Sequence, residues 1–248
     1  MDYKILWYDS ATSSNDIAKE LAEKNEPHFT TIVVNSQTKG RGRTGRSFIS
    51  SSENGLYMSM ILRPNKECSY YNTLTPMIAV AVLRALEKTA GVSPKIKWVN
   101  DLYLNDKKIC GILTESKLNS NGYEYIICGI GVNITLPENG FDNEIAQIAG
   151  AVFENTAPKN YKETLCKAII TELISLYNLE CKEEYMKAYK ENSLIIGLDV
   201  DVYVGDKVYS GKAIDIDENG ELVVECINGE IKSFNSGEAR VRKSGVPL

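Results

Sequence analysis

One short segment of this 248-residue chain, between Lys39 and Arg46, combines positive charge with glycine. It holds four cationic side chains and three glycines in eight residues, although the whole chain carries a net charge of −5. Arginine binds phosphate or carboxylate oxygens through paired hydrogen bonds, and glycine lets the backbone approach a ligand closely. The segment therefore predicts an anion-binding loop. It does not match the Walker A pattern, and a solvated basic loop, or one that docks an acidic partner, is the alternative.

A carboxylate and an ammonium group are predicted to meet at the end of a hairpin. Asp101 is expected to end one strand, and Lys108 begins the paired strand seven residues later, after a turn at Asn105-Asp106. Such a pair can hold a nucleotide with Mg²⁺, or it can orient an attacking amine. A surface salt bridge worth about 0–1 kcal/mol is the alternative.

Two further segments carry polar groups at the borders of predicted elements. Gly129 and Gly131 interrupt an apolar run that ends at Asn133, which suggests a ligand lying against the backbone. The Asn133 amide offers the donor and acceptor that can read an adenine edge, with a bulge and a structural asparagine as the alternative. Ser13-Ser14-Asn15 precede an amphipathic helix, where a plain helix cap is the alternative to ligand contact. Ser13 and Asp16 approximate a capping box.

These residues must be positioned by an α/β (α+β) domain with a mixed sheet, followed by a small β-barrel. The periodicity predicts helices at 17–22, 76–90, 161–179 and 183–191, and strands at 3–8, 30–34, 56–62, 96–99, 102–104, 108–115, 123–128 and 130–134. Five short strands with regular turns follow, at 199–204, 207–216, 221–226, 230–234 and 239–242. We place the domain boundary near 193, which gives domains 1–192 and 193–248.

Composition excludes several classes of protein. Hydrophobic residues make up 43% and charged residues 25%, so the chain can bury a substantial core. No apolar run reaches the roughly 18 residues of a membrane span, and the N-terminus lacks a signal peptide, which predicts a cytoplasmic protein. The six cysteines form no C-x-x-C pair and are expected to be buried free thiols. His28 is the sole histidine, so a multi-histidine zinc site is excluded and a Ser-His-Asp triad would depend on it.

The order and spacing of five motifs resemble the biotin protein ligases over nearly the whole chain. The motifs are Ser13-Ser14-Asn15, Gly40-Arg41-Gly42-Arg43-Thr44-Gly45-Arg46, Lys97-Trp98-Val99-Asn100-Asp101-Leu102, Lys108-Ile109-Cys110-Gly111-Ile112-Leu113 and Gly129-Ile130-Gly131-Val132-Asn133. The resemblance implies a mixed-sheet catalytic domain related to class II aminoacyl-tRNA synthetases, with a C-terminal SH3-like barrel. It also implies that ATP and biotin form biotinyl-5′-AMP, and that the biotinyl group then passes to a lysine.

The resemblance also assigns roles to individual residues, with Mg²⁺ accompanying ATP and no metal ligand assigned. The implied catalytic residues are Arg43, Lys108 and Asp101. The implied biotin-binding residues are Ser13, Ser14, Asn15, Gln37, Arg41, Gly42, Arg43, Lys108 and Gly111. The implied ATP-binding residues are Gly40, Arg41, Arg43, Arg46, Phe48, Asn100, Lys108 and Asn133.

The sequence departs from the family pattern at four positions. Ser14 replaces a threonine and keeps the hydroxyl, whereas Val99 stands where proline is usual and removes a backbone constraint. Phe48 replaces a tryptophan and keeps an aromatic lid, and Cys110 is expected to add a reactive thiol near the site. We further expect residues 39–52 to become ordered when ligands bind, because a closed loop would protect the adenylate from water.

The implied partner is a biotin carboxyl carrier domain of acetyl-CoA carboxylase or a related carboxylase. We expect no nucleic acid, because the catalytic domain already begins at Tyr3 and leaves no room for a DNA-binding module, and we expect no membrane. Homodimers can form in this family by joining sheet edges. Two other functions stay open: a lipoate or octanoate ligase, which shares the fold but typically lacks the glycine–arginine run, and a non-catalytic binding module.

Overall fold

A seven-stranded mixed sheet forms the larger part of the molecule. The computed structural model describes residues 3–50, 54–120 and 122–242. The strand order is β1-β2-β3-β7-β6-β5-β4, with β1 and β2 parallel and all other neighbours antiparallel. This confirms the predicted mixed sheet. The strands are β1 (Lys4–Ala11), β2 (Thr30–Gln37), β3 (Gly55–Leu62), β4 (Lys95–Lys97), β5 (Asp101–Leu104), β6 (Lys107–Asn119) and β7 (Gly122–Asn133).

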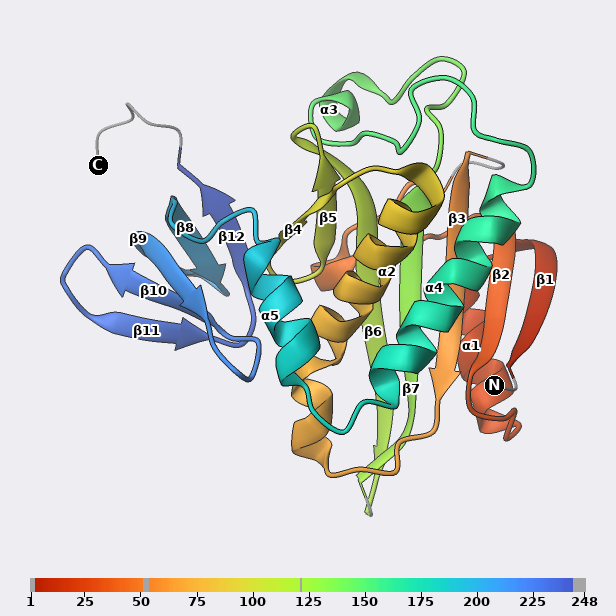
Figure 1. The fold of residues 1–248 in the computed structure, drawn as a ribbon, viewed down its shortest axis with the longest axis horizontal. Helices are drawn as coiled ribbons and strands as arrows, with labels where there is room; N and C mark the ends of the chain where they lie inside the picture. Colours follow the sequence, from red (N-terminus) through yellow and green to blue (C-terminus); the bar gives the residue numbers. More distant parts are fainter. Residues whose placement is uncertain (1–2, 51–53, 121, 243–248) are drawn as a thin grey trace.

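Helices cover the two faces of this sheet unequally (Figure 1). One face carries α2 (Leu74–Ala90), α4 (Tyr161–Tyr177) and α5 (Glu183–Glu191), and the other carries α1 (Ser14–Glu23). Because α2 packs against the sheet as well as α4 and α5, it is apolar nearly all round, as its sequence predicts. A short helix, α3 (Asn143–Ala146), lies in the long connection after β7 and was not predicted.

The region predicted as two strands, 123–128 and 130–134, is the single strand β7. Gly129 and Gly131 keep their pairing with β3 and β6, so no bulge forms at either glycine. Both glycines instead make room for side chains. A Cβ atom on Gly129 would lie 2.3 Å from Asn15 Oδ1, and one on Gly131 would lie 2.7 Å from the Phe48 ring. The missing side chains thus let α1 and the loop after β2 lie directly on the sheet.

The C-terminal part is a five-stranded antiparallel sheet in the order β11-β10-β9-β8-β12. Its strands confirm the five predicted ones and are β8 (Asp199–Val204), β9 (Lys207–Ile216), β10 (Leu222–Cys226), β11 (Ile231–Phe234) and β12 (Glu238–Val241). The indole of Trp98 donates a hydrogen bond of 3.0 Å to Gly220 O, and the two sheets share one continuous apolar core. The domain boundary near 193 stays a prediction; α5 ends at Glu191 and β8 begins at Asp199.

The cysteines and the histidine are only partly as expected. All six cysteines are free, but Cys68 and Cys181 are exposed, since neither lies in an apolar strand or helix. His28 packs against Phe29 and Tyr177 and accepts a hydrogen bond of 2.8 Å from the backbone N of Arg63. Burial and the Arg63 charge lower its pKa to about 4, so it is neutral at pH 7. Among the described residues, no helix is both long enough and apolar enough to cross a membrane.

Candidate active site

The glycine–arginine loop (residues 39–50) folds into a tight turn after β2. Phe48 N donates to Gly40 O at 2.9 Å, and Gly42 N donates to Arg46 O at 2.7 Å. Only glycine fits at position 40, since a Cβ atom there would lie 2.3 Å from Phe48 O. The turn sends its three arginines to three different neighbours. The expectation that residues 39–52 become ordered on binding stays a prediction, and residues 51 and 52 lie outside the described part.

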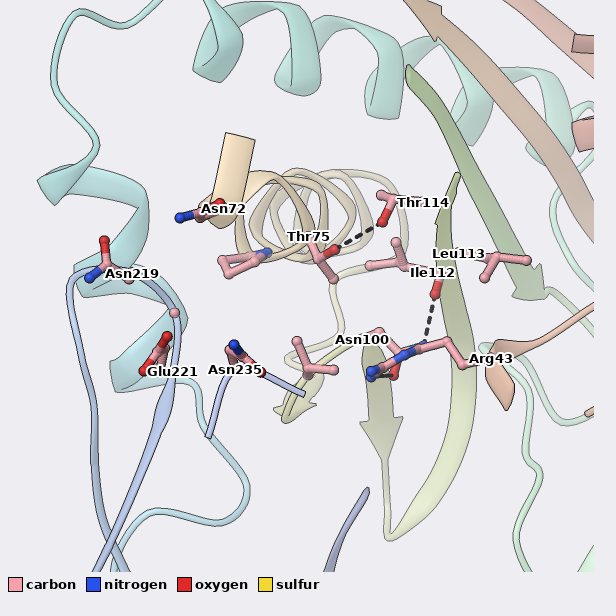
Figure 2. A pocket seen from close by; sticks show the side chains of 13 residues that line it. Arg43, Asn72, Thr75, Asn100, Ile112, Leu113, Thr114, Asn219, Glu221 and Asn235 are labelled. Atoms are coloured by element: carbon pink, nitrogen blue, oxygen red, sulfur yellow. Dashed lines mark hydrogen bonds between the residues drawn. The ribbon is translucent and has the colours of Figure 1, made fainter. Parts of the chain in front are cut away.

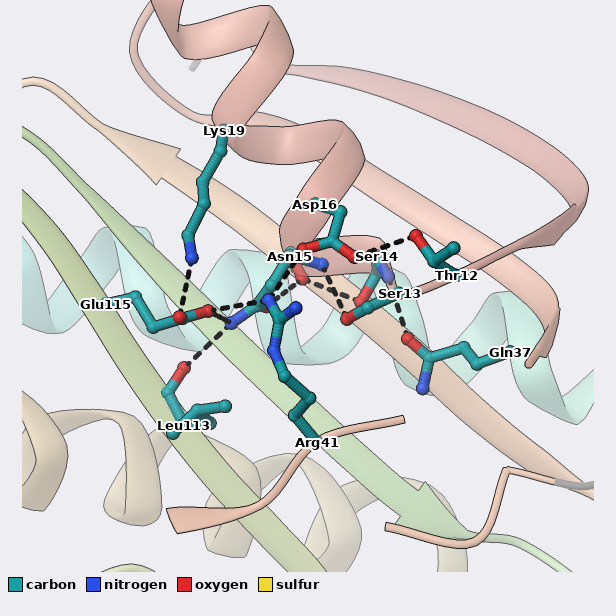
Figure 3. A network of polar contacts seen from close by, with 11 residues as sticks. Thr12, Ser13, Ser14, Asn15, Asp16, Lys19, Gln37, Arg41, Leu113 and Glu115 are labelled. Carbon is teal, nitrogen blue, oxygen red and sulfur yellow. Dashed lines mark hydrogen bonds and ion pairs between the residues drawn. The ribbon is translucent and has the colours of Figure 1, made fainter. Parts of the chain in front are cut away.

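Arg41 joins an ionic network on the α1 side of the sheet (Figure 3). Its Nη2 lies 2.7 Å from Asp16 Oδ1 and 3.3 Å from Glu115 Oε2, while Lys19 Nζ lies 2.6 Å from Glu115 Oε1. Burial raises the pKa of Glu115, but hydrogen bonds from Lys19 and Asn15 and the nearby charges outweigh it, so the pKa is lowered. Two cations and two ionised carboxylates therefore balance each other here.

Ser13, Ser14 and Asn15 form the N-terminus of α1 and are almost fully buried. Ser13 Oγ accepts a hydrogen bond from Asn15 N at 3.2 Å, which confirms the predicted helix cap. The predicted capping box is wrong in its second half, because the Asp16 carboxylate binds Thr12 and Arg41 instead.

Gln37, at the end of β2, holds the serine segment in place. Its Oε1 accepts from Ser14 N at 2.7 Å, and its Nε2 donates to Ser50 Oγ at 2.8 Å. Ser50 in turn donates to Phe48 O at 3.0 Å. The start of α1, the end of β2 and the glycine–arginine loop are therefore joined by one chain of hydrogen bonds.

The predicted meeting of Asp101 and Lys108 is confirmed. Lys108 Nζ lies 2.7 Å from Asp101 Oδ1, an ion pair whose angle does not make an aligned hydrogen bond. Asn100 is fixed beside them, because its Nδ2 donates to Ile112 O at 2.8 Å. Arg43 Nη1 donates to Asn100 Oδ1 at 3.5 Å. Burial lowers the pKa of Arg43, and the charge of Asp101 only partly opposes this.

Phe48 lies over the two glycines Gly111 and Gly131, on the face of the sheet that α1 also covers. A Cβ atom on Gly111 would lie 3.2 Å from the Phe48 ring and 3.4 Å from Lys108 Nζ. Asn133, at the end of β7, donates from Nδ2 to Gly150 O at 2.9 Å and is 8% exposed. This bond ties the connection after β7 to the sheet and leaves one Nδ2 hydrogen and Oδ1 for other partners.

Arg46 lies apart from the other predicted residues and forms an ion pair with Glu238 of β12. Glu238 also accepts a hydrogen bond from Arg240 Nε at 3.1 Å. On the neighbouring strand β4, burial lowers the pKa of Lys97, although the charges of Asp101 and Glu238 oppose the shift. The loop is thus held to the C-terminal sheet by its last arginine.

A polar cavity of about 280 Å³ lies between the middle of β6, the start of α2 and the C-terminal sheet (Figure 2). Arg43 and Asn100 are the predicted site residues that line it. Thr75 and Thr114 hydrogen-bond across it at 3.4 Å, and Asn219, Glu221 and Asn235 contribute from the C-terminal sheet. The cavity does not reach the serine segment or Gln37.

The structure thus separates the predicted residues into groups. One cluster, on the α1 side, contains Ser13, Ser14, Asn15, Gln37 and Arg41; a second contains Arg43, Asn100, Asp101 and Lys108. Arg46 and Asn133 lie with other partners. The expectation of a reactive Cys110 is wrong: the thiol is fully buried, and burial raises its pKa. The Trp98–Val99 peptide bond is cis, although no proline is present.

Several residues of these clusters were not predicted. Glu115 shares a sheet face with Gly111 and Leu113 by the period-two rule, a signal that could have found it. Ser59 lies in the middle of the apolar strand β3. Glu238 and its partner Arg46 are 192 residues apart in the sequence. Local sequence patterns contain no signal for such distant contacts. Within the described residues, no group of His, Cys, Asp and Glu side chains forms a metal site.

Comparisons with known proteins agree with this geometry. Residues 7–133 match the biotin/lipoate A/B protein ligase family, and residues 195–242 match the biotin protein ligase C-terminal domain. The bifunctional ligase/repressor BirA of Bacillus subtilis is 32% identical over 244 residues, covering 95% of this chain and 74% of the relative. The biotin–[acetyl-CoA-carboxylase] ligase of Mycobacterium tuberculosis is 22% identical over 234 residues, covering 92% and 85%.

A solved structure supports the same assignment. The biotin protein ligase from Aquifex aeolicus, in complex with biotin and ATP, aligns with a TM-score of 0.76 and 27% identity over 97% of this chain and 99% of that one. The chain belongs to the biotin/lipoate A/B protein ligase family. Its C-terminal match and its relatives place it among the biotin protein ligases, which confirms the family resemblance and the fold class.

Proposed function

We propose that this chain joins biotin and ATP into biotinyl-5′-AMP and then transfers the biotinyl group to a lysine of a biotin carboxyl carrier domain. The observation that carries the proposal is the cluster of Arg43, Asn100, Asp101 and Lys108, which gathers two cations, an amide and a carboxylate at one sheet edge in a chain of this family. The six cysteines are free, which fits the cytoplasmic compartment that we propose.

In the first step, a carboxylate oxygen of biotin attacks the α-phosphorus of ATP. The bond from that phosphorus to the bridging oxygen breaks, and pyrophosphate leaves. Both reactants are anions, so positive charge must be present before they meet. Arg43 and Lys108 supply it. Mg²⁺ would accompany the ATP phosphates and would supply further positive charge to this step, and no protein ligand is assigned to it.

In the second step, the acceptor lysine attacks the acyl carbon, and AMP leaves as the proton of the amine is lost. A free lysine has a pKa of about 10.4, so most of it is protonated at pH 7. Asp101 orients this amine and receives its proton, and the ion pair with Lys108 keeps the carboxylate in place. The acceptor carboxylase is the one whose biotin carboxyl carrier domain provides this lysine.

The α1-side cluster holds the biotin head. Ser13, Ser14, Asn15, Gln37 and Arg41 bring hydroxyl, amide and guanidinium groups next to one another. The proposal also includes four further residues that bind ATP: Gly40, Arg46, Phe48 and Asn133. It places Gly42 and Gly111 beside biotin.

Pyrophosphate release from Mg-ATP, with biotin or lipoate as the acid, tests the proposal. We expect release with biotin alone, as one burst per site until a biotin carrier domain is added. Release with lipoate alone would move the chain to the lipoate branch of the family. An Asp101→Asn variant should keep the burst and slow the transfer, which separates the two steps. No release with either acid would contradict the proposed enzyme.

A further inference from the structure

We propose that Glu115 and Ser59 are positioning residues that make the Ser14 hydroxyl a hydrogen-bond acceptor, and so select an N–H group of the biotin urea ring. The inference rests on the proposed function, which places the biotin head beside Ser14. Neither Glu115 nor Ser59 belongs to the motifs that carried the family resemblance. Glu115 contacts Asn15, and Ser59 contacts both Asn15 and Ser14 (Figure 3 shows Glu115, Asn15 and Ser14).

Glu115 fixes the orientation of the Asn15 amide. An ionised carboxylate can only accept hydrogen bonds, so the Asn15 group that lies 2.7 Å from Glu115 Oε2 must be the NH₂. The same Nδ2 lies 3.4 Å from Leu113 O, another acceptor. Asn15 is 3% exposed and packs against Gly129, where even a Cβ atom would lie 2.3 Å from its Oδ1. The amide therefore has one orientation.

The Asn15 orientation in turn fixes the proton of Ser59. Ser59 Oγ lies 2.5 Å from Asn15 Oδ1 and 2.7 Å from Ser14 Oγ, and Ser59 is fully buried. A hydroxyl has one proton, and a carbonyl oxygen has none. Ser59 must therefore donate to Asn15, and the proton shared by the two serines must come from Ser14.

Ser14 is left with lone pairs and no free proton. Its hydroxyl can accept a hydrogen bond from a ligand but cannot donate one. The urea ring of biotin carries two N–H donors and one carbonyl acceptor, so Ser14 recognises an N–H group. The network that begins at the Glu115 carboxylate thus makes the Ser14 hydroxyl prefer a hydrogen-bond donor on the ligand.

The substitution Glu115→Gln should reverse this polarity. Lys19 Nζ lies 2.6 Å from Glu115 Oε1, and an ammonium group requires an oxygen there. The new amide nitrogen then faces Asn15, which turns its own oxygen toward it. Asn15 Nδ2 would donate to Ser59, Ser59 to Ser14, and Ser14 outward. Ser59→Ala removes the link without changing any charge, and Glu124→Gln on β7 is the matched control outside the network.

The experiment measures biotin-dependent pyrophosphate release and biotin binding by calorimetry. It compares biotin with the two cyclic carbamates in which one ring N–H is replaced by oxygen. The unmodified protein and Glu124→Gln should disfavour one carbamate by about tenfold. Glu115→Gln and Ser59→Ala should raise the KM for biotin by about tenfold and leave kcat and the KM for ATP unchanged. Ser59→Ala should reduce the discrimination to within about twofold, whereas Glu115→Gln should invert it.

The outcomes separate the inference from the proposed function. If the unmodified protein uses biotin and both network variants retain its discrimination between biotin and the carbamates, the positioning role is wrong while the ligase function stands. A fall in kcat together with equal rises in the KM values for biotin and ATP would also contradict it, because this pattern indicates a purely structural role. If the unmodified protein does not respond to biotin, the proposed function fails and the inference falls with it.

Discussion

Arg41 and Arg43 are two residues apart in the glycine–arginine loop, yet the fold places them in opposite electrostatic surroundings. Burial lowers the pKa of both side chains to some extent, but at Arg41 the pairing with Asp16 and Glu115 outweighs it and raises the pKa. At Arg43 burial outweighs the attraction of Asp101. At Arg43 the charge of Asp101 only partly offsets the cost of burial, so an incoming anion stabilises the charged side chain further. The comparison therefore assigns Arg41 to positioning the α1-side cluster that holds biotin, and Arg43 to stabilising charge on the phosphate.

The largest expected effect is the loss of Arg43. The substitution Arg43→Ala removes a charge that faces the cavity and would stabilise the anionic transition state of adenylate formation. We expect kcat for biotin-dependent pyrophosphate release to fall by about 100- to 1000-fold, the range for loss of one preorganised electrostatic group. Single-turnover measurement of biotinyl-AMP formation checks this result.

Arg41→Ala is the matched comparison, because it removes the same side chain two positions away. It should raise the KM for biotin by about tenfold, with kcat retained within about threefold. Arg84→Ala, an exposed arginine paired with Glu184 on the helical face, should change neither constant. Equal kcat losses in Arg41→Ala and Arg43→Ala would contradict the division of roles between them.

Some features of the fold and the site were predictable from the sequence, but the difference between the two arginines was not. The meeting of Asp101 and Lys108 was predictable, because a hairpin with a short turn brings its two strands close together. The two residues are diagonal neighbours, since Asp101 lies opposite Gly111 and Lys108 opposite Tyr103. The buried central helix and the five C-terminal strands were predictable from periodicity and turn residues. The different surroundings of Arg41 and Arg43 were not, because they depend on side chains that are distant in sequence.

Glycine was the residue type most easily misread. Gly129 and Gly131 indicated either a bulge or a ligand against the backbone, and the structure places protein side chains there instead, those of Asn15 and Phe48. A glycine in the sequence indicates that a side chain is missing at that position, but it does not indicate which group occupies the space. The ion pair between Arg46 and Glu238 was also not predictable, because it depends on how the two sheets pack against each other.

The network around Arg41 should show itself in the pH dependence of stability. The folded pKa of Glu115 lies below its ordinary value of 4.5, so its contribution is present above about pH 4.5 and is lost as the pH falls through the folded pKa. We expect Glu115→Gln to lower the free energy of unfolding by about 1 kcal/mol at pH 7, a value discounted for partial exposure. Denaturant titrations of both proteins from pH 7 to pH 3 check this.

The difference between the two proteins should shrink as the pH falls below 4.5. Asp16 has a lowered pKa as well, but it is present in both proteins and its contribution cancels in the difference to first order. A difference that is constant with pH would mean that the variant loses packing rather than a charge interaction, and would weaken the contrast with Arg43.

The smallest expected effect concerns the third arginine of the loop. Arg46 is largely exposed and Glu238 is half-buried, so their ion pair is worth about 0–1 kcal/mol and is screened by salt. Glu238→Gln should therefore increase the rate of tryptic cleavage within residues 39–46 by about two- to fivefold at low ionic strength, and the increase should disappear at about 1 M salt. Glu225→Gln, on the exposed side of β10, is the control and should leave cleavage unchanged. If Glu238→Gln matched that control at low salt, the ion pair of Arg46 would not restrain the loop, and the contacts of Gln37, Arg41 and Arg43 would hold it to the rest of the site.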